Sequence, residues 1–377
     1  MNFRRLKAIT KKELLHIVRD PRSLTLALLQ PLVTLLLYGY ALTLDVDRIP
    51  TYVYDQDRTP ESRELIDQFR GSRYFQIHGM VNDYRTIERG IDKSSILLSV
   101  VIPKDYSRHL NAGDQANVQL LIDGSDSNTA SMALGYAEAV VTSYGAQLRS
   151  DAQVRHGGQP LRVPVEPRIR VWYNSDLKSK NYIVPGLIAV TMMMIASMLS
   201  SLTIAREWEN GTMEQLLSTP VRPTELVLGK LLAYFALGIV DMLIALVIGV
   251  FAFQVPFRGN ALFLMFTSFL FLLGAVSWGI FLSATARSQL MAYQLGMLSS
   301  FLPAYLLSGF IYSIQNMPKL IQVISYLVPA RYFVTILNGI FLKGIGIHFL
   351  LTEVVMLSAY AGLVFWGATR KMRQKVA

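Results

Sequence analysis

Long uncharged apolar runs constrain this chain more than any other feature. Leu24–Leu44 alone has 21 residues without a charged side chain, and a helix that crosses a bilayer needs about 20 predominantly apolar residues. Only 16% of the chain is charged, against about 25% in soluble domains. Six such runs predict a polytopic α-helical membrane protein with six transmembrane helices: Leu24–Leu44, Ile183–Ala205, Leu231–Phe257 with Asp241 inside it, Gly259–Ala286, Ser288–Pro318, and Phe349–Thr369 with Glu353 near its start.

The segment between the first two runs has a different composition. Residues 45–181 contain 17 basic and 18 acidic side chains spread throughout. Short alternating or apolar runs predict strands at Thr51–Tyr54, Ile96–Ile102, Val118–Ile122 and Ile169–Trp172, and helical patterns lie around Glu61–Phe69 and Ala130–Leu148. We therefore expect a small α/β domain at 45–181, preceded by a first span at 23–44 and followed by a five-span membrane domain at 182–377.

The first 22 residues predict a helix that lies along a membrane surface. Its apolar residues fall on one helical arc and its basic residues on the other; the arc contains Phe3, Leu6, Ile9, Leu14, Ile17 and Val18. Leu15 does not fit that face, and a solvated basic tail is the alternative. Near the other end of the chain, residues 314–348 contain two prolines and two amphipathic segments, which predict short re-entrant helices rather than a full crossing.

The distribution of Lys and Arg predicts the orientation. The whole excess of the +10 net charge lies outside residues 45–181, so it indicates membrane orientation rather than binding of nucleic acid. With the N-terminus inside, the inner flanks hold 15 Lys and Arg and the outer short loops hold four. Both termini are therefore expected in the cytoplasm and the α/β domain outside.

Several kinds of chemistry are disfavoured. The chain has no cysteine, which excludes disulfides and thiolate sites, and its five histidines are scattered without metal-ligand spacing. It has no G-x-x-x-x-G-K-[ST] phosphate loop, because Gly229-Lys230 is followed by Leu231. We expect a chain that is not an enzyme and binds no cofactor or metal itself.

The segment from Arg206 to Pro220 is the most informative about mechanism. Asn210-Gly211 can stop the emerging helix, since glycine tolerates the left-handed conformation. Thr212 with Gln215 fits a capping box for a new short helix, which Pro220 ends. The result is a surface-exposed acidic elbow on the inner side, bearing Glu207, Glu209 and Glu214. An ordinary solvated loop and a docking element for a cytoplasmic partner both explain it.

The sequence R-E-W-E-N-G-T-M-E-Q-L-L-S-T-P-V at Arg206–Val221 resembles the E-x-E-x-G-T-x-E-x-L-x-x-T-P signature of type-2 ABC exporter permeases. Further segments resemble the drug-efflux branch in the same order along the chain: Lys12-Glu13 with Arg19-Asp20-Pro21, Leu120–Ala130, Leu307–Phe310, Asn316–Pro318, Pro329–Phe333 and Leu342–Gly344. The resemblance covers essentially the whole chain.

This resemblance implies a permease subunit in a bacterial inner membrane. Such a permease pairs with a second permease, as a homodimer or a heterodimer, and with two cytoplasmic ATP-binding subunits that supply ATP and Mg²⁺; a periplasmic adaptor protein is a further candidate partner. It also implies hydrophobic or amphipathic small molecules as substrates. The elbow at 206–221 then corresponds to the coupling helix, with the site residues Arg206, Glu207, Glu209, Gly211, Thr212, Glu214, Thr219 and Pro220.

Other residues are candidates for the translocation path or its gate. Asp241 lies in the middle of a span, where a charge costs at least about 2.5–3.5 kcal/mol; it serves transport or is a hydrogen-bonded structural acid. Gln30-Pro31 can kink the first span. Met194 and Met198 suit varied apolar ligands, although plain packing is the alternative. Two rival functions stay open: an ATP-independent secondary transporter that uses Asp241, and a membrane-anchored sensor.

Overall fold

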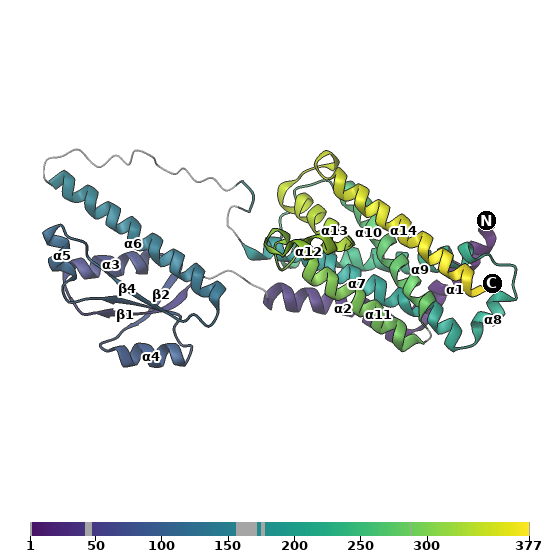
Figure 1. The fold of residues 1–377 in the computed structure, drawn as a ribbon, viewed down its shortest axis with the longest axis horizontal. Helices are drawn as coiled ribbons and strands as arrows, with labels where there is room; N and C mark the ends of the chain where they lie inside the picture. Colours follow the sequence, from purple (N-terminus) through teal and green to yellow (C-terminus); the bar gives the residue numbers. More distant parts are fainter. Residues whose placement is uncertain (1, 42–46, 156–171, 175–177, 287, 377) are drawn as a thin grey trace. The chain divides into compact units, whose positions relative to one another are not determined.

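The computed structural model describes residues 2–41, 47–155, 172–174, 178–286 and 288–376. The chain divides into two compact units. One unit, Met1–Thr43 with Val171–Ala377, is helical, and the other, Leu44–Arg170, contains the sheet (Figure 1). The second unit ends at Arg170, whereas the sequence predicts the inserted domain to run to residue 181.

The smaller unit is an α/β fold around one four-stranded sheet. Its elements in chain order are β1 (Ile49–Asp55), α3 (Pro60–Gly71), β2 (Phe75–Met80), α4 (Tyr84–Asp92), β3 (Leu98–Ile102), α5 (Tyr106–Ala112), β4 (Gln119–Ile122) and α6 (Ser127–Arg155). The strand order is β2-β1-β3-β4. β1 is parallel to both of its neighbours, and β4 is antiparallel to β3.

Both faces of this sheet are covered, but unequally. Figure 1 shows α3 and α6 on one face and α4 on the other. The larger core joins β1, β2 and β3 to α3, α5 and α6, with Leu65, Phe69 and Leu98 each about 1% exposed or less. The smaller core, centred on Ile87, Ile96 and Val101, lies under α4. The sheet therefore has a hydrophobic core of its own.

The predicted strands agree with this sheet in three places, and one strand of the sheet was missed. β1, β3 and β4 overlap Thr51–Tyr54, Ile96–Ile102 and Val118–Ile122, whereas β2 was not predicted. β2 is an edge strand with an irregularity where Ile77 and Gly79 pair with consecutive residues of β1, so its side chains do not alternate regularly. The predicted strand Ile169–Trp172 lies mostly outside the described residues, and Trp172 itself is not in a strand.

Low pH is expected to loosen the first turns of α4 and α6. Asp83 caps α4 by accepting hydrogen bonds from the Thr86 amide (2.7 Å) and hydroxyl (3.0 Å), and Asp126 accepts hydrogen bonds from the hydroxyl and the amide of Thr129 at the start of α6. These bonds lower the pKa of both carboxyl groups. A lowered pKa gives stability that is complete above the ordinary value of 3.8 and is lost as the pH falls through the folded value. Hydrogen exchange of the Thr86 and Thr129 amides, corrected for the intrinsic rate, should be faster in acid than at neutral pH. Equal protection of these amides in acid and at neutral pH would contradict this expectation.

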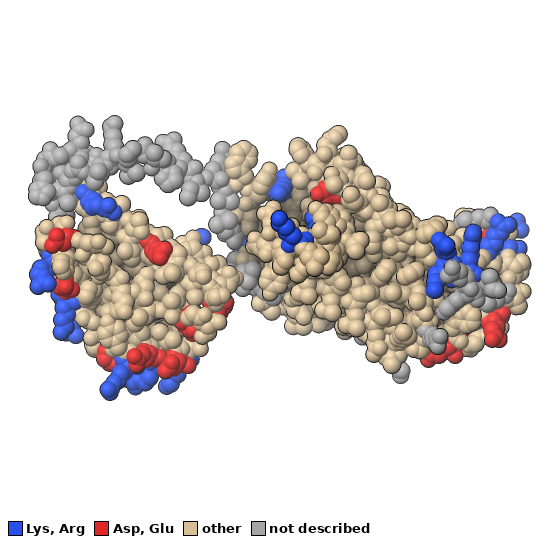
Figure 2. Space-filling model, in the orientation of Figure 1, with Lys and Arg blue, Asp and Glu red and all other residues tan. Residues whose placement is uncertain are grey.

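In the described part of the larger unit, five helical segments are long and apolar enough to cross a membrane. They are α7 (Ser179–Glu209), α9 (Pro223–Val247) with the π-helical turn η1 (Ile248–Ala252), α10 (Ala261–Thr285), α11 (Gln289–Leu307) and α14 (Leu351–Val376). The space-filling view shows a belt of uncharged surface between two charged ends of this unit (Figure 2). The chain is thus a polytopic helical protein, and its described residues contain five candidate spans, or six if the bent pair described next counts as one.

Two further predicted membrane segments are helical. The first span was expected at Leu24–Leu44, and the described helix α2 (Pro21–Ala41) covers Leu24–Ala41, with residues 42–44 outside the described part of the chain. Within 314–348, Lys319–Ser325 and Pro329–Lys343 form a pair bent by 85°, where α12 (Lys319–Ser325) meets α13 (Pro329–Asn338) and the π-helical turn η3 (Gly339–Lys343).

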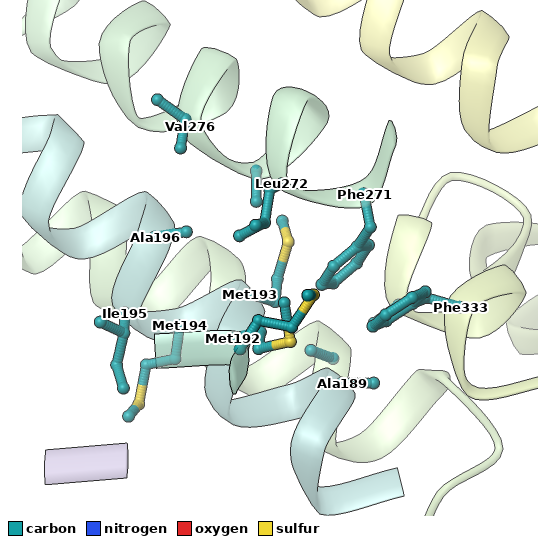
Figure 3. Close-up of a cluster of buried hydrophobic side chains, with 14 of the residues drawn as sticks. Ala189, Met192, Met193, Met194, Ile195, Ala196, Phe271, Leu272, Val276 and Phe333 are labelled. Atoms are coloured by element: carbon teal, nitrogen blue, oxygen red, sulfur yellow. The ribbon is translucent and has the colours of Figure 1, made fainter. Parts of the chain in front are cut away.

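α7 is the central helix of the larger unit. The apolar window of α7 is 94% buried, and a Cβ at Gly279 of α10 would lie 2.2 Å from the carbonyl oxygen of Ser197. Figure 3 shows Met192 and Met193 against Phe271, while Met194 points away. The Phe271 ring stacks on Phe333 at 4.1 Å. α7 therefore packs through a close backbone contact with α10 and through its own methionine side chains.

Candidate functional site

The elbow predicted at Arg206–Pro220 joins two membrane-length helices at one end of the helical unit. α7 ends at Glu209, Gly211 adopts a left-handed φ of 71°, and α8 (Thr212–Leu217) follows before α9 begins at Pro223. Met213 is fully buried in the helical core. The opposite side of the elbow is exposed, at Glu209, Asn210, Gly211, Glu214, Gln215, Ser218, Thr219 and Pro220. The elbow is therefore an anchored turn with one free polar side.

The predicted capping box is wrong. Gly211 rather than Thr212 is the N-cap of α8, so Thr212 is already the first helical residue. The Thr212 hydroxyl donates instead to the carboxylate of Glu207. Gly211 in the left-handed conformation limits the turn between α7 and α8 to two residues, Asn210 and Gly211. The side chain of Thr212 is thereby directed back toward α7.

The three acids of the elbow lie in three different environments. Glu207 is 8% exposed and faces the protein interior, which contradicts its expected place on an exposed acidic surface. Glu209 is exposed, and its carboxylate accepts a hydrogen bond of 2.7 Å from the amide of Gln289 at the start of α11. Glu214 is exposed, and its carboxylate pairs with no basic group among the described residues. Of the three, Glu214 is the most available for an outside partner.

A buried ion network holds Glu207. The ammonium of Lys230 in α9, whose side chain is 1% exposed, lies 2.6 Å from Glu13 Oε1 and 3.5 Å from Glu207 Oε1. Lys12 closes the network at 2.7 Å from the same Glu207 oxygen. Two cations and two carboxylates thus neutralise one another where a single buried charge would be costly. The network joins α1 (Phe3–Arg19), the end of α7 and the beginning of α9.

The first turn of α1 is fastened to the other side of the elbow. The backbone amide of Asn2 donates to Glu225 Oε1 at 2.6 Å, and the second oxygen of Glu225 accepts from the Arg222 amide at 3.2 Å. The guanidinium of Arg5 donates to the carbonyl oxygen of Pro220. Ile9 packs directly on Gly229, where a Cβ would lie 2.6 Å from it. Both ends of the elbow therefore rest on α1.

Arg206 connects the elbow to two further elements. Its guanidinium lies 2.9 Å from His16 Nε2 and 3.7 Å from the Asp20 carboxylate at the end of α1. It also donates to the side-chain oxygen of Gln289 at 3.3 Å. Among the predicted site residues, Arg206, Glu207 and Thr212 thus bind other residues of this chain. Four others lie on the exposed side of the elbow: Gly211, Glu214, Thr219 and Pro220.

The sequence analysis did not identify Lys230 and Glu13 as parts of this site. For each residue, one feature of the sequence indicates that its charge is buried. Glu13 occupies the apolar face of α1 between Ile9 and Ile17 at helical spacing, and Lys230 directly precedes an apolar run. A charged residue on an apolar face needs a buried partner of opposite charge. The sequence could not show that these two residues are partners.

The candidate translocation residues come from three helices, α2, α7 and α9. Met194 and Met198 are 4% and 2% exposed within the core around α7. Pro31 lies inside α2 with Gln30 before it. Asp241 is 4% exposed, and its Oδ1 has no hydrogen-bond partner among the described residues. No group of three or more potential metal ligands occurs in the described part of the chain.

Comparison with known proteins places this arrangement in a wider context. Residues 22–370 match the profile of the family described as ABC-2 family transporter proteins. The "Probable multidrug ABC transporter permease YbhS" of Escherichia coli is 35% identical over 99% of this chain and 98% of its own length. YbhR, which carries the same description, is 32% identical over 90% of both chains. The "Inner membrane transport permease YhhJ" is 26% identical over 97% of this chain and 96% of its own length.

Proposed function

The chain belongs to the ABC-2 family of transporter proteins, and from this premise we propose that it is one of two permease subunits of an exporter whose ATP-binding subunits dock on the elbow at 206–221. In this proposal ATP and Mg²⁺ are bound by those partner subunits. The second permease is a copy of this chain or a related one.

One observation carries the docking proposal. The exposed side of α8 projects from a turn that is fastened to α1, α7 and α9 by the network of Lys12, Glu13, Glu207 and Lys230. Figure 2 shows acidic side chains near α8, beside the basic surface where both termini lie. A partner that pushes on α8 displaces three helices together, because the ion network leaves the elbow little freedom of its own. Since α7 is the central helix, this displacement reaches the whole core.

The same proposal includes location and orientation. The chain is a multi-pass membrane protein, and its bacterial relatives support the inner membrane. The excess of Lys and Arg in the flanks on the side of both termini supports a cytoplasmic elbow. The α/β unit, Leu44–Arg170, then lies outside the cytoplasm.

For the substrate we propose hydrophobic or amphipathic small molecules, drugs among them. The descriptions of two relatives as multidrug permeases support this class. If deletion and overexpression leave susceptibility to a broad drug panel unchanged, the substrate class is wrong.

Glu214→Lys is the sharpest test of docking. The substitution reverses the one elbow carboxylate that is exposed and unpaired among the described residues, so it is expected to leave thermal stability within about 0.5 kcal/mol. Co-purification of the ATP-binding subunits should fall at least about tenfold, and ATPase activity stimulated by the permease should fall with it.

Glu138→Lys is the matched control, because it makes the same charge change at an exposed helical position of the α/β unit. It should retain full co-purification and activity. Glu207→Ala is a poor test, since it disrupts the buried network and weakens the fold itself. Wild-type co-purification and activity in Glu214→Lys would remove the docking assignment.

Asp241 favours one second function, ion-coupled transport. Its carboxyl group is buried, with one oxygen that has no hydrogen-bond partner among the described residues, and the same face of α9 carries Gly238 against Leu272. Purified protein in liposomes is expected to move no substrate under an ion gradient without ATP-binding subunits. Transport under those conditions, lost in Asp241→Asn, would favour the second function instead.

A further inference from the structure

The short loop between α10 and α11 is fastened to the last turns of α7 on both of its sides. α10 ends at Thr285 and α11 begins at Gln289. On the α10 side, the buried hydroxyl oxygen of Ser283 accepts hydrogen bonds of 2.9 Å from the backbone amides of Ile204 and Ala205. On the α11 side, Gln289 is held by two residues of α7. The end of α7 therefore carries the α10–α11 hairpin as well as the elbow.

Gln289 is bound both through its backbone and through its side chain. As the first residue of α11, it has an amide without a partner inside its own helix, and the Glu209 carboxylate accepts the hydrogen bond of that amide at 2.7 Å. A carboxylate at this end of a helix also interacts favourably with the helix dipole. The side-chain oxygen of Gln289 accepts a hydrogen bond of 3.3 Å from Arg206 Nε. Arg206 and Glu209 are three residues apart on α7, so they lie on one face and reach the same residue of α11.

Arg206 is itself held in place by other groups. Its guanidinium lies 2.9 Å from His16 Nε2 and 3.7 Å from the Asp20 carboxylate at the end of α1, and its side chain is only 22% exposed. A hydrogen bond from a charged donor is also stronger than one between neutral groups. A displacement of α7 at Arg206 therefore acts directly on Gln289.

The ion network of the elbow does not supply this connection, because its four residues belong to α1, α7 and α9. α11 meets α7 again about two turns after Gln289, where a Cβ at Gly296 would lie 2.7 Å from Ser201 Oγ. Close packing of this kind keeps the two helices side by side. The bonds at Gln289 fix where α11 begins relative to the elbow.

We propose that Gln289 is a positioning residue that passes a displacement of the elbow to the α10–α11 hairpin, with Arg206 and Glu209 as its contacts on α7. This inference rests on the proposed docking of ATP-binding subunits at the elbow. It adds a second route to that proposal, since the ion network leads to α1 and α9 and Gln289 leads to α11. It also gives Glu209 a role toward α11 rather than toward the ATP-binding subunits.

The absence of cysteine in the chain allows a test with pairs of spin labels in the permease alone. Ser218→Cys places one label on the exposed side of the elbow, and Leu298→Cys places the second on α11, where the native side chain is 56% exposed. The reference pair combines Ser218→Cys with Leu363→Cys on α14, where the native side chain is 69% exposed. Double electron–electron resonance of the whole protein in nanodiscs gives the distance distribution of each pair.

Gln289→Met removes the amide oxygen and keeps a side chain of similar length. We expect the distance distribution between the elbow and α11 to broaden, because the bond from Arg206 is lost, while the reference pair keeps its width. Glu209→Leu with Gln289→Met removes both bonds and should broaden the same distribution most. Gln289→Glu retains an acceptor oxygen at the same reach and should restore the narrow distribution. Gln294→Met is the matched control, because it makes the same change at an exposed position of the same helix and should leave both distributions unchanged.

A second measurement tests the relay itself in the complex with ATP-binding subunits. Labels at Leu298→Cys and Leu363→Cys report the position of α11 relative to α14. In the otherwise unmodified chain, addition of ATP with vanadate should shift the distance between them, and Gln289→Met should abolish that shift. Co-purification of the ATP-binding subunits should be retained in Gln289→Met, because Gln289 lies outside the exposed side of the elbow.

Four results would overturn the proposal. An unchanged distribution between the elbow and α11 in Gln289→Met would show that this residue does not fix the start of α11, and a Gln289→Glu variant that stays broad would show that the acceptor oxygen is not the cause. Broadening of both label pairs would make Gln289 a residue that stabilises the whole unit. Loss of co-purification in Gln289→Met would place it in the docking surface. The measurement on the permease alone needs no partner, so failure of this inference is distinguishable from failure of the docking proposal.

Discussion

Lys230→Met is expected to lower the free energy of unfolding by about 3–5 kcal/mol, because it leaves a buried carboxylate without its cation. The side chain of Glu13 is 5% exposed and lies 2.6 Å from the Lys230 ammonium. Glu207 keeps Lys12 as a partner, so Glu13 suffers most of the loss. Thermal unfolding of the detergent-purified protein, followed by tryptophan fluorescence, measures the change.

Lys12→Met provides the matched control within the same network. The Lys12 side chain is 51% exposed, and an ion pair open to solvent contributes less than about 1 kcal/mol. The double variant Lys230→Met with Glu13→Met removes both charges and should recover most of the lost stability. If Lys230→Met proves as stable as Lys12→Met, the buried pair does not hold α1 on the helical unit.

Gly279→Ala is expected to have the second large effect. A Cβ at this position would lie 2.0 Å from Ser200 Oγ and 2.2 Å from the carbonyl oxygen of Ser197. The hydroxyl can rotate away, but the carbonyl belongs to the backbone of α7, so α7 and α10 must separate. Overpacking of this kind costs up to about 3 kcal/mol and occasionally more. We expect the free energy of unfolding to fall by about 3 kcal/mol. The yield of monodisperse protein in size-exclusion chromatography should fall as well.

Gly362→Ala is the corresponding control in α14. No atom of the described residues lies within 4 Å of a Cβ built there, and alanine is the better helix former by up to about 1 kcal/mol. This variant should therefore be as stable as the original chain or slightly more stable. Similar unfolding temperatures for the two alanine variants would show that α7 and α10 tolerate a wider separation.

The sequence predicts the long helices well because the length of each apolar run can be read directly from the sequence. It predicts the turn at Asn210-Gly211 for the same local reason, since Gly211 has the left-handed φ that only glycine adopts freely. The capping box failed because two local patterns competed for Thr212, and the left-handed glycine moved the helix start by one residue. β2 was missed because Phe75–Met80 contains a glycine and an irregular register at the sheet edge.

The candidate site could be predicted only in part, because its organisation depends on distant contacts. The exposed acid Glu214 follows from the polarity of its neighbours in the sequence. The burial of Glu207 cannot be predicted in this way, since Lys12 lies in a helix that precedes the α/β unit in the sequence and Lys230 in one that follows it. Met194 and Met198 illustrate the same limit: a methionine run fits a ligand surface or a core equally well, and only the packing of α10 and α11 around α7 places it in the core.

The separation of 217 positions between Glu13 and Lys230 also bears on how the protein is made. A ribosome that adds about 5–20 residues each second needs on the order of 10–40 s to reach Lys230 after Glu13 has been synthesised. During that interval α1 and α2 exist without α7 and α9, and the α/β unit between them is completed first. The carboxylate of Glu13 therefore has no Lys230 to pair with until the third quarter of translation.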